Sequence, residues 1–345
     1  IGACNQADAP GNYPVSHQIS FGGSVAVHTA VRRPMIGVVA PPARADHTGA
    51  HDLKLPHERF AYSPMNARPR WALPKGARIA VYCVLNIEEW NIEKPVAREY
   101  LSSPAGVVTV PNVPNWSWHE YGMRVGIWRV IDALVKRRID ASVAINACVC
   151  EGPGEPVARA LKELGWEFMG HGQTQAALRS LPDQGEAIRQ SFGSLERYTG
   201  VAPRGWLGPG LHETLDTLDW LAEAGFKYVF DWPLDEHPIE MRTAHGPVVA
   251  MPYSMETGDL PMMVVHHHQS DVWLKRMKDQ FDRLYREGAR QPRVMSMSVH
   301  PFVIGVPHRI RYFEALFDYM RRHKGVWFAT AAQIYDWYRE HPPST

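Results

Sequence analysis

The sequence is poor in cysteine, with only Cys4, Cys83, Cys148 and Cys150 among 345 residues. So few cysteines in a chain of this length exclude a scaffold held together by disulfides. Cys148 and Cys150 are one residue apart and no second cysteine pair follows, so their spacing does not match a structural zinc motif. We therefore expect reduced, buried thiols and a cytoplasmic protein.

Long apolar runs and an excess of one charge are also absent. The longest apolar run, Ile79 to Leu85, is far shorter than the roughly 20 residues of a transmembrane helix. The first ten residues lack the basic segment and apolar core of a secretory signal. The 37 basic and 36 acidic residues give a net charge of +1, which argues against nucleic acid or a membrane surface as the main partner.

Proline and glycine are frequent in the first 75 residues, which show no helical or strand period. We predict an irregular extension over residues 1–75 and one catalytic domain over residues 76–345. In that domain, apolar segments of strand length alternate with amphipathic segments of helical length, as in a parallel sheet covered by helices. The pattern predicts an α/β fold, a (β/α) barrel of seven or eight units.

The boundaries of these elements follow from the apolar runs and stripes. The predicted strands are 78–87, 140–147, 166–169, 204–207, 227–231, 248–253, 294–299 and 326–330. The predicted helices carry stripes over 125–135, 157–164, 188–195, 215–221, 274–284 and 313–320.

Polar residues follow several of these strands, where the reactive groups of a β/α barrel lie. Glu88 and Glu89 follow the first strand, and neighbours in an extended segment point to opposite sides, so that one can act as a base while the other binds a cation. His171, Asp231 and His300 follow three later strands. This set predicts a hydrolase with a base, an orienting group and an acid that titrates near neutrality.

A second group of residues is predicted to bind substrate at the mouth of the barrel. Its members are His171, Trp206, Arg124, Tyr253 and Glu256. Trp206 also fits a core position, and Arg124 a surface ion pair. Asp259, which follows the same strand as Tyr253, is expected to hydrogen-bond a polar substrate. The run 266–268, three consecutive histidines, is expected to be a solvated loop because three adjacent side chains cannot all face one ion.

The order of these motifs resembles a known family. The stretches 119–126, 170–172, 252–256 and 300–302 are similar to the polysaccharide deacetylase superfamily, with NodB homology and carbohydrate esterase family four, in the branch of the cofactor-independent allantoinases. The resemblance implies a distorted barrel. It also implies that Glu88 takes the place of the family's catalytic base and Glu89 that of its metal ligand, both aspartates in the metal-dependent members.

The same resemblance shows where this chain departs from the family. His171 matches the first histidine of the His-x-x-x-His metal motif, but Gln175 replaces the second, and an amide is a poorer zinc ligand than imidazole. Leu207 stands where the family has an arginine that orients the base. Asp231 and His300 match the family's aspartate and its general acid.

Three hypotheses follow. In the first, the chain hydrolyses a non-peptide carbon–nitrogen bond of a small or cyclic amide, in the manner of allantoinase and without a cofactor. Glu88 deprotonates water, His171 polarises the carbonyl or holds an ion with Glu89, and His300, supported by Asp231, protonates the leaving nitrogen.

In the second hypothesis, the chain removes the acetyl group of an N-acetyl sugar with one divalent ion, such as zinc, bound by Glu89, His171 and Gln175. In the third, it is an inactive barrel that binds a small ligand. A homo-oligomer is compatible with each of the three.

Overall fold

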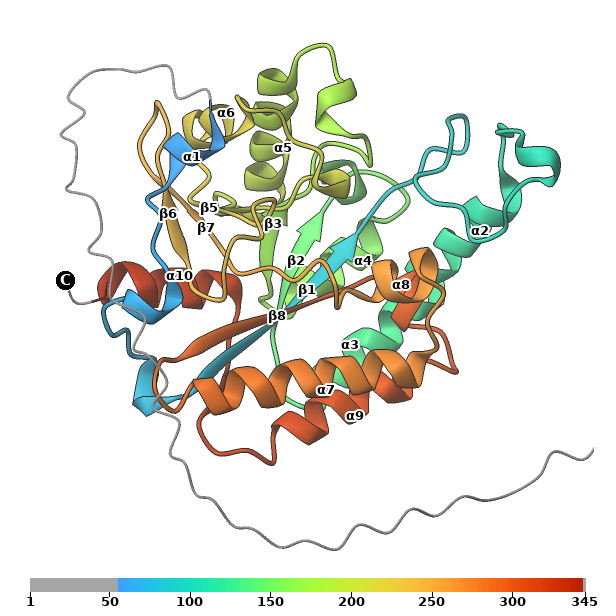
Figure 1. Ribbon diagram of the computed structural model, residues 1–345. Helices are drawn as coiled ribbons and strands as arrows, with labels where there is room; N and C mark the ends of the chain where they lie inside the picture. Colours follow the sequence, from blue (N-terminus) through green and yellow to red (C-terminus); the bar gives the residue numbers. More distant parts are fainter. Residues whose placement is uncertain (1–54, 344–345) are drawn as a thin grey trace, which may run out of the picture. The chain divides into compact units, whose positions relative to one another are not determined.

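The computed structural model describes residues 55–343, which form an α/β fold around one sheet (Figure 1). The sheet has nine strands in the order β6-β7-β5-β4-β3-β2-β1-β8, and β9 also pairs with β1. The strands are β1 (Ile79–Ile87), β2 (Ala141–Ile145), β3 (Glu167–Gly170), β4 (Gly205–Trp206), β5 (Tyr228–Val229), β6 (Ile239–Met241), β7 (Val248–Ala250), β8 (Arg293–Val299) and β9 (Val326–Phe328).

Strand β1 lies next to β8, the last strand in the order of the sheet, and all nine of its residues are buried. It pairs in parallel with β8 on one side, and with β2 and β9 on the other, β9 near its start and β2 near its end. A strand enclosed in this way must be apolar on both faces, as its sequence is. Every ladder is parallel except that of β6 and β7. Within residues 55–343 no ladder joins β8 to β6, so the predicted barrel is confirmed as a curled half-barrel.

Helices cover the sheet on both faces (Figure 1). They are α1 (Pro56–Arg59), α2 (Val113–Tyr121), α3 (Ile127–Val135), α4 (Glu155–Glu163), α5 (Gln184–Thr199), α6 (Thr217–Ala224), α7 (Ser270–Glu287), α8 (Pro301–Ile304), α9 (Ile310–Met320) and α10 (Ala331–Glu340). Gly200 and Gly225 end α5 and α6 in the left-handed conformation, which glycine adopts without strain.

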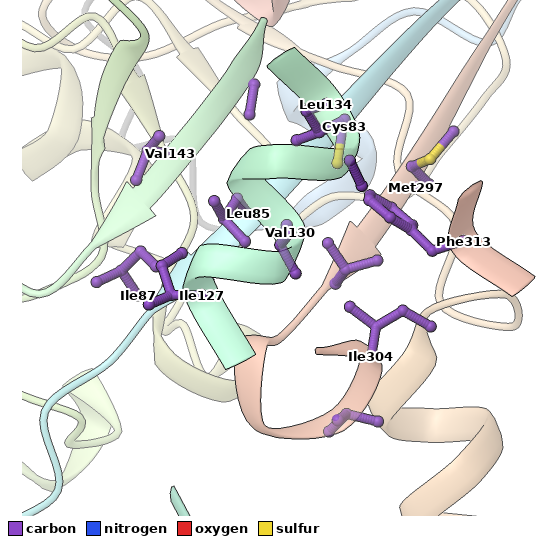
Figure 2. Packing of buried hydrophobic residues seen from close by; sticks show 14 of the residues in the cluster. Cys83, Leu85, Ile87, Ile127, Val130, Leu134, Val143, Met297, Ile304 and Phe313 are labelled. Atoms are coloured by element: carbon purple, nitrogen blue, oxygen red, sulfur yellow. The ribbon is translucent and has the colours of Figure 1, made fainter. Parts of the chain in front are cut away.

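The largest core cluster lies between β1, β8 and the helices α3, α7 and α9. Figure 2 shows part of it, with Leu85 of β1, Val130 of α3 and Phe313 of α9. Cys83 and Cys150 are buried, Cys148 is half-buried, and all three are free thiols, which agrees with the predicted packing role. No helix in the described part of the chain is long and apolar enough to cross a membrane.

The predicted N-terminal extension is described only from residue 55, and residues 1–54 lie outside the described part. Residues 55–75 are irregular apart from short helical turns, and they pack on the barrel. Arg59 is buried and forms two hydrogen bonds of 2.7 Å with Asp219 of α6. Trp71 and Leu73 join a core cluster with Ile334 of α10. This part of the extension therefore contributes to the core.

Candidate active site

A cavity of about 640 Å³ opens at the carboxyl ends of the parallel strands. Its polar walls come from residues that follow β1, β3, β7 and β8. They include Glu88, His171, Gln175, Tyr253, Glu256 and His300, and Arg98, His212 and His266 also line the cavity. Asn86 of β1 donates to Ser298 Oγ at 2.9 Å and to Val299 O at 3.1 Å, and so holds the ends of β1 and β8 together beneath the cavity.

Glu88 is the central charged group of this cavity. One of its oxygens, Oε1, lies 3.5 Å from His300 Nε2 and 3.8 Å from His171 Nε2. The other, Oε2, accepts a hydrogen bond of 2.7 Å from Trp90 Nε1. Burial alone would raise the pKa of Glu88, but the hydrogen bond and the positive charge of His300 oppose burial, and the pKa of Glu88 lies below its ordinary value. Glu88 is therefore ionised.

His171 presents a free nitrogen to Glu88. Its Nδ1 bonds to the carbonyl oxygen of Leu207, and because a carbonyl can only accept, Nδ1 carries the proton. In the neutral ring Nε2 then bears a lone pair, and it is buried without a hydrogen-bond partner among the described residues. The predicted polarisation of a substrate carbonyl by His171 would need a proton on Nε2, and it stays a prediction.

His300 is held by Asp259. The imidazole Nδ1 and the backbone N–H of His300 each lie 2.8 Å from an oxygen of this fully buried carboxylate. Burial lowers the pKa of His300, but the charge and hydrogen bond of Asp259, with those of Glu88, raise it to about 10. His300 is thus an imidazolium whose Nε2–H points at Glu88. The predicted support of His300 by Asp231 is wrong, because Asp259 occupies that position.

Asp231 instead anchors the loop that orients His171. Both of its carboxylate oxygens lie 2.9 Å from the backbone N–H of Gly208, the residue after Leu207, whose carbonyl accepts from His171. Burial raises the pKa of Asp231 to about 6. Asp231 is therefore a positioning residue that acts through residues 207–208, and it lies outside the cavity walls.

Similar proteins with known structures share this architecture. The crystal structure of a Pseudomonas aeruginosa polysaccharide deacetylase is 27% identical to the chain, with a TM-score of 0.72 over 81% of this chain and 97% of that one. The Puue allantoinase is 26% identical, with a TM-score of 0.75 over 86% of this chain and 99% of the other.

The sequence comparisons agree. A curated Schizosaccharomyces pombe protein that carries the name polysaccharide deacetylase is 27% identical over 314 residues, 82% of this chain and 96% of its own length. No protein-family model matches the chain.

The chain has the polysaccharide deacetylase fold. Deacetylases and allantoinase both hydrolyse carbon–nitrogen bonds other than peptide bonds, so the similar proteins confirm the predicted enzyme class, a hydrolase of such bonds.

The three metal ligands that the deacetylase resemblance implied, Glu89, His171 and Gln175, do not all lie in the cavity. Glu89 does not line the cavity. Its backbone N–H donates to Asn146 Oδ1 at 2.9 Å, and its half-buried carboxylate, whose pKa burial raises, lies near Glu120 and His119. Neighbouring residues of an extended segment point to opposite sides, so Glu89 points away from the cavity because Glu88 points into it.

His171 Nε2 and the buried, unpartnered Gln175 Oε1 remain as neutral acceptors in the cavity. Over residues 55–343, no group of three His, Cys, Asp or Glu side chains is arranged to hold an ion. The donors present therefore do not fit a three-ligand zinc site, and we derive no step through a metal.

The other predicted substrate residues divide into two groups. Tyr253 and Glu256 line the cavity. Trp206 is fully buried in a core cluster, and Arg124 is exposed on the π-helical turn Gly122–Gly126 before α3, so neither forms a wall of the cavity. For Trp206 the core alternative is correct, since its indole packs on Phe226.

Proposed function

We propose that this deacetylase-fold enzyme removes the acetyl group from an N-acetylated saccharide, releasing acetate and a free amine. The observation that carries the proposal is the pairing of ionised Glu88 with protonated His300 across 3.5 Å in an accessible cavity. Amide hydrolysis needs a base for water and an acid for the departing nitrogen, and these two groups are in the required states at neutral pH. The similarity to polysaccharide deacetylases supports a saccharide as the carrier of the amide.

The first half of the reaction uses the acceptor side of the cavity. A water molecule beside Glu88 Oε1 and His171 Nε2 can donate one O–H to each, because both atoms are acceptors. Glu88 takes a proton as the water oxygen bonds to the amide carbon, and the carbonyl becomes an oxyanion. The imidazolium of His300, whose Nε2 lies 3.5 Å from Glu88 Oε1, is a charged donor that stabilises the tetrahedral intermediate.

The second half depends on the proton of His300. When the carbon–nitrogen bond breaks, Nε2–H of His300 is transferred to the nitrogen, which leaves as an amine. Asp259 keeps Nδ1 protonated throughout and fixes the ring. Glu88 then returns its proton to His300 or to solvent, and acetate departs. Gln175 Oε1, a buried acceptor without a partner in residues 55–343, is suited to receive the N–H of the substrate amide.

A cyclic amide is the second candidate substrate. It is favoured by the similarity to the Puue allantoinase along 86% of the chain and by a donor set that does not form a three-ligand metal site. The same acid and base would open a ring by the same two proton transfers, with the nitrogen remaining attached to the product.

The test measures the hydrolysis of two kinds of substrate, each with chelator-treated and with untreated protein. N-acetylated chito-oligosaccharides are assayed for acetate and free amine, and allantoin for ring opening. The proposal predicts equal amounts of acetate and amine from the saccharide. Ring opening of allantoin without acetate release from the saccharide would contradict the proposal and support the cyclic amide as the substrate. A loss of activity that is restored by added zinc would show that an ion takes part despite the donor set.

A further inference from the structure

A second hollow, of about 670 Å³, lies beside the active cavity and is lined by two arginines and three histidines. We call it the basic hollow. Its chemistry-bearing residues are His267, His268, His308, Arg309, Arg311 and Asp271. Two arginines and three histidines thus face a single carboxylate. None of them belongs to the catalytic group. Residues 266–268 lie in a loop in which His266 and His267 are exposed, as expected from the sequence.

Arg309 is the most informative residue of the basic hollow. Three arginines are buried among residues 55–343, namely Arg59, Arg293 and Arg309. Arg59 is paired with Asp219 and Arg293 with Glu287. Arg309 has no carboxylate partner in the described chain, and the one hydrogen bond of its side chain there runs from Nη1 to the carbonyl oxygen of Val303 at 3.2 Å. A buried guanidinium without a counter-charge is costly unless a ligand supplies one.

The start of α7 adds donors to the same hollow. Gln269 and Ser270 line it, and the helix, 18 residues long, has no side-chain cap at its N-terminus. Its first backbone N–H groups are therefore available to a ligand, and their partial positive charge favours an anion. Asp271 in the first turn opposes this effect but leaves an excess of cationic groups.

The basic hollow and the active cavity share two stretches of wall. His266 lines the active cavity, and the next two residues line the hollow. In the same way Arg98 faces the active cavity and Tyr100 the hollow. A saccharide whose acetamido group lies beside Glu88 would cross these stretches to place a substituent in the hollow.

We propose that the basic hollow binds an anionic substituent, a carboxylate or a phosphate, of the saccharide that the active cavity deacetylates. This inference rests on the proposed function for the identity of the ligand, but the hollow's affinity for an anion does not depend on it. Arg309 and Arg311 supply charge-assisted hydrogen bonds to the anion. A neutral saccharide gains nothing from them, so the hollow selects among N-acetylated substrates.

The first experiment measures anion binding alone, by calorimetric titration of the full chain with inorganic phosphate. We expect binding by the wild type and a loss of at least ~10-fold in affinity in both Arg309→Gln and Arg311→Gln, because a charge-assisted contact is removed. Arg290→Gln, an exposed position beyond the other end of α7, is the matched control and should bind as the wild type does. Circular dichroism checks folding, and the exposed Arg311 provides the test if Arg309→Gln does not fold.

The second experiment compares deacetylation of a neutral N-acetyl sugar with that of N-acetyl sugars bearing a carboxylate or a phosphate. We expect a kcat/KM at least ~10-fold higher for one anionic sugar, and a return toward the neutral value in Arg311→Gln. The better anionic sugar identifies the source of the charge.

Absent phosphate binding, or binding that is unchanged in both arginine variants, would overturn the proposal even if acetate is released. Phosphate binding that needs both arginines, in a protein that deacetylates nothing, would instead refute the proposed function and leave the anion site standing.

Discussion

Replacing Asp259 with asparagine tests whether Asp259 keeps His300, the proposed general acid, protonated. Asp259 accepts from Nδ1 and from the backbone N–H of His300, and its charge is the largest influence that raises the pKa of His300, against burial, to about 10. Because an adjacent opposite charge shifts a pKa by roughly 1–3 units, the variant should lower this pKa by a similar amount. His300 must be protonated to act as an acid, so activity is lost as pH rises through its pKa. The alkaline limb should therefore move to lower pH.

The assay is the pH profile of kcat/KM, which reports groups of the free enzyme. The wild type should keep its activity up to about pH 10, whereas Asp259→Asn should lose it roughly 1–3 units earlier. The acid limb should stay in place, because it belongs to Glu88. Asp279→Asn, an exposed partner of Lys275, is the control. An unchanged alkaline limb in a folded Asp259→Asn protein would refute the assignment of His300 as the acid that Asp259 maintains.

Two further substitutions test how the active cavity is positioned. Asp231→Ala should lower kcat/KM by roughly 10-fold while the protein stays folded, because the variant frees the backbone N–H of Gly208 and with it the loop that orients His171. An unchanged kcat/KM would contradict the positioning role of Asp231. Gly126→Ala should destabilise the fold by about 1–3 kcal/mol, since a Cβ there would lie 2.2 Å from the backbone oxygen of Pro301. Thermal melting should show this loss, and Gly193→Ala, which meets only a flexible arginine side chain, should not show it.

Much of the barrel could be predicted because its strands are buried on both faces. The strand predicted over residues 78–87 differs from β1 by a single residue, since a continuous apolar run admits few alternatives. Strand β6 was missed because its three residues form an antiparallel edge without an apolar run. Helix α10 was also missed, although Thr330 and Gln333 form a capping box at its start, which is a signal that the sequence carries.

The site was only partly predictable for a similar reason. Glu88 and His300 follow the neighbouring strands β1 and β8 directly, so their position along the chain fixes where they lie. Asp259 is nine residues beyond β7, and nothing in the sequence shows that the intervening loop returns it to His300. The sequence predicts that Asp259 hydrogen-bonds substrate. It predicts Asp231 beside His300, because Asp231 closely follows its strand. Pairing between side chains on separate loops depends on tertiary packing, which strand position does not reveal.

The central claim is that Glu88, and not its neighbour Glu89, is the base. The most direct test compares Glu88→Gln with Glu89→Gln on the substrate that the wild type hydrolyses. The account predicts that Glu88→Gln lowers kcat by at least ~10²-fold, the scale of a lost general base, and that Glu89→Gln stays within a few-fold of the wild type. The opposite result, with Glu89→Gln inactive and Glu88→Gln active, would contradict the account.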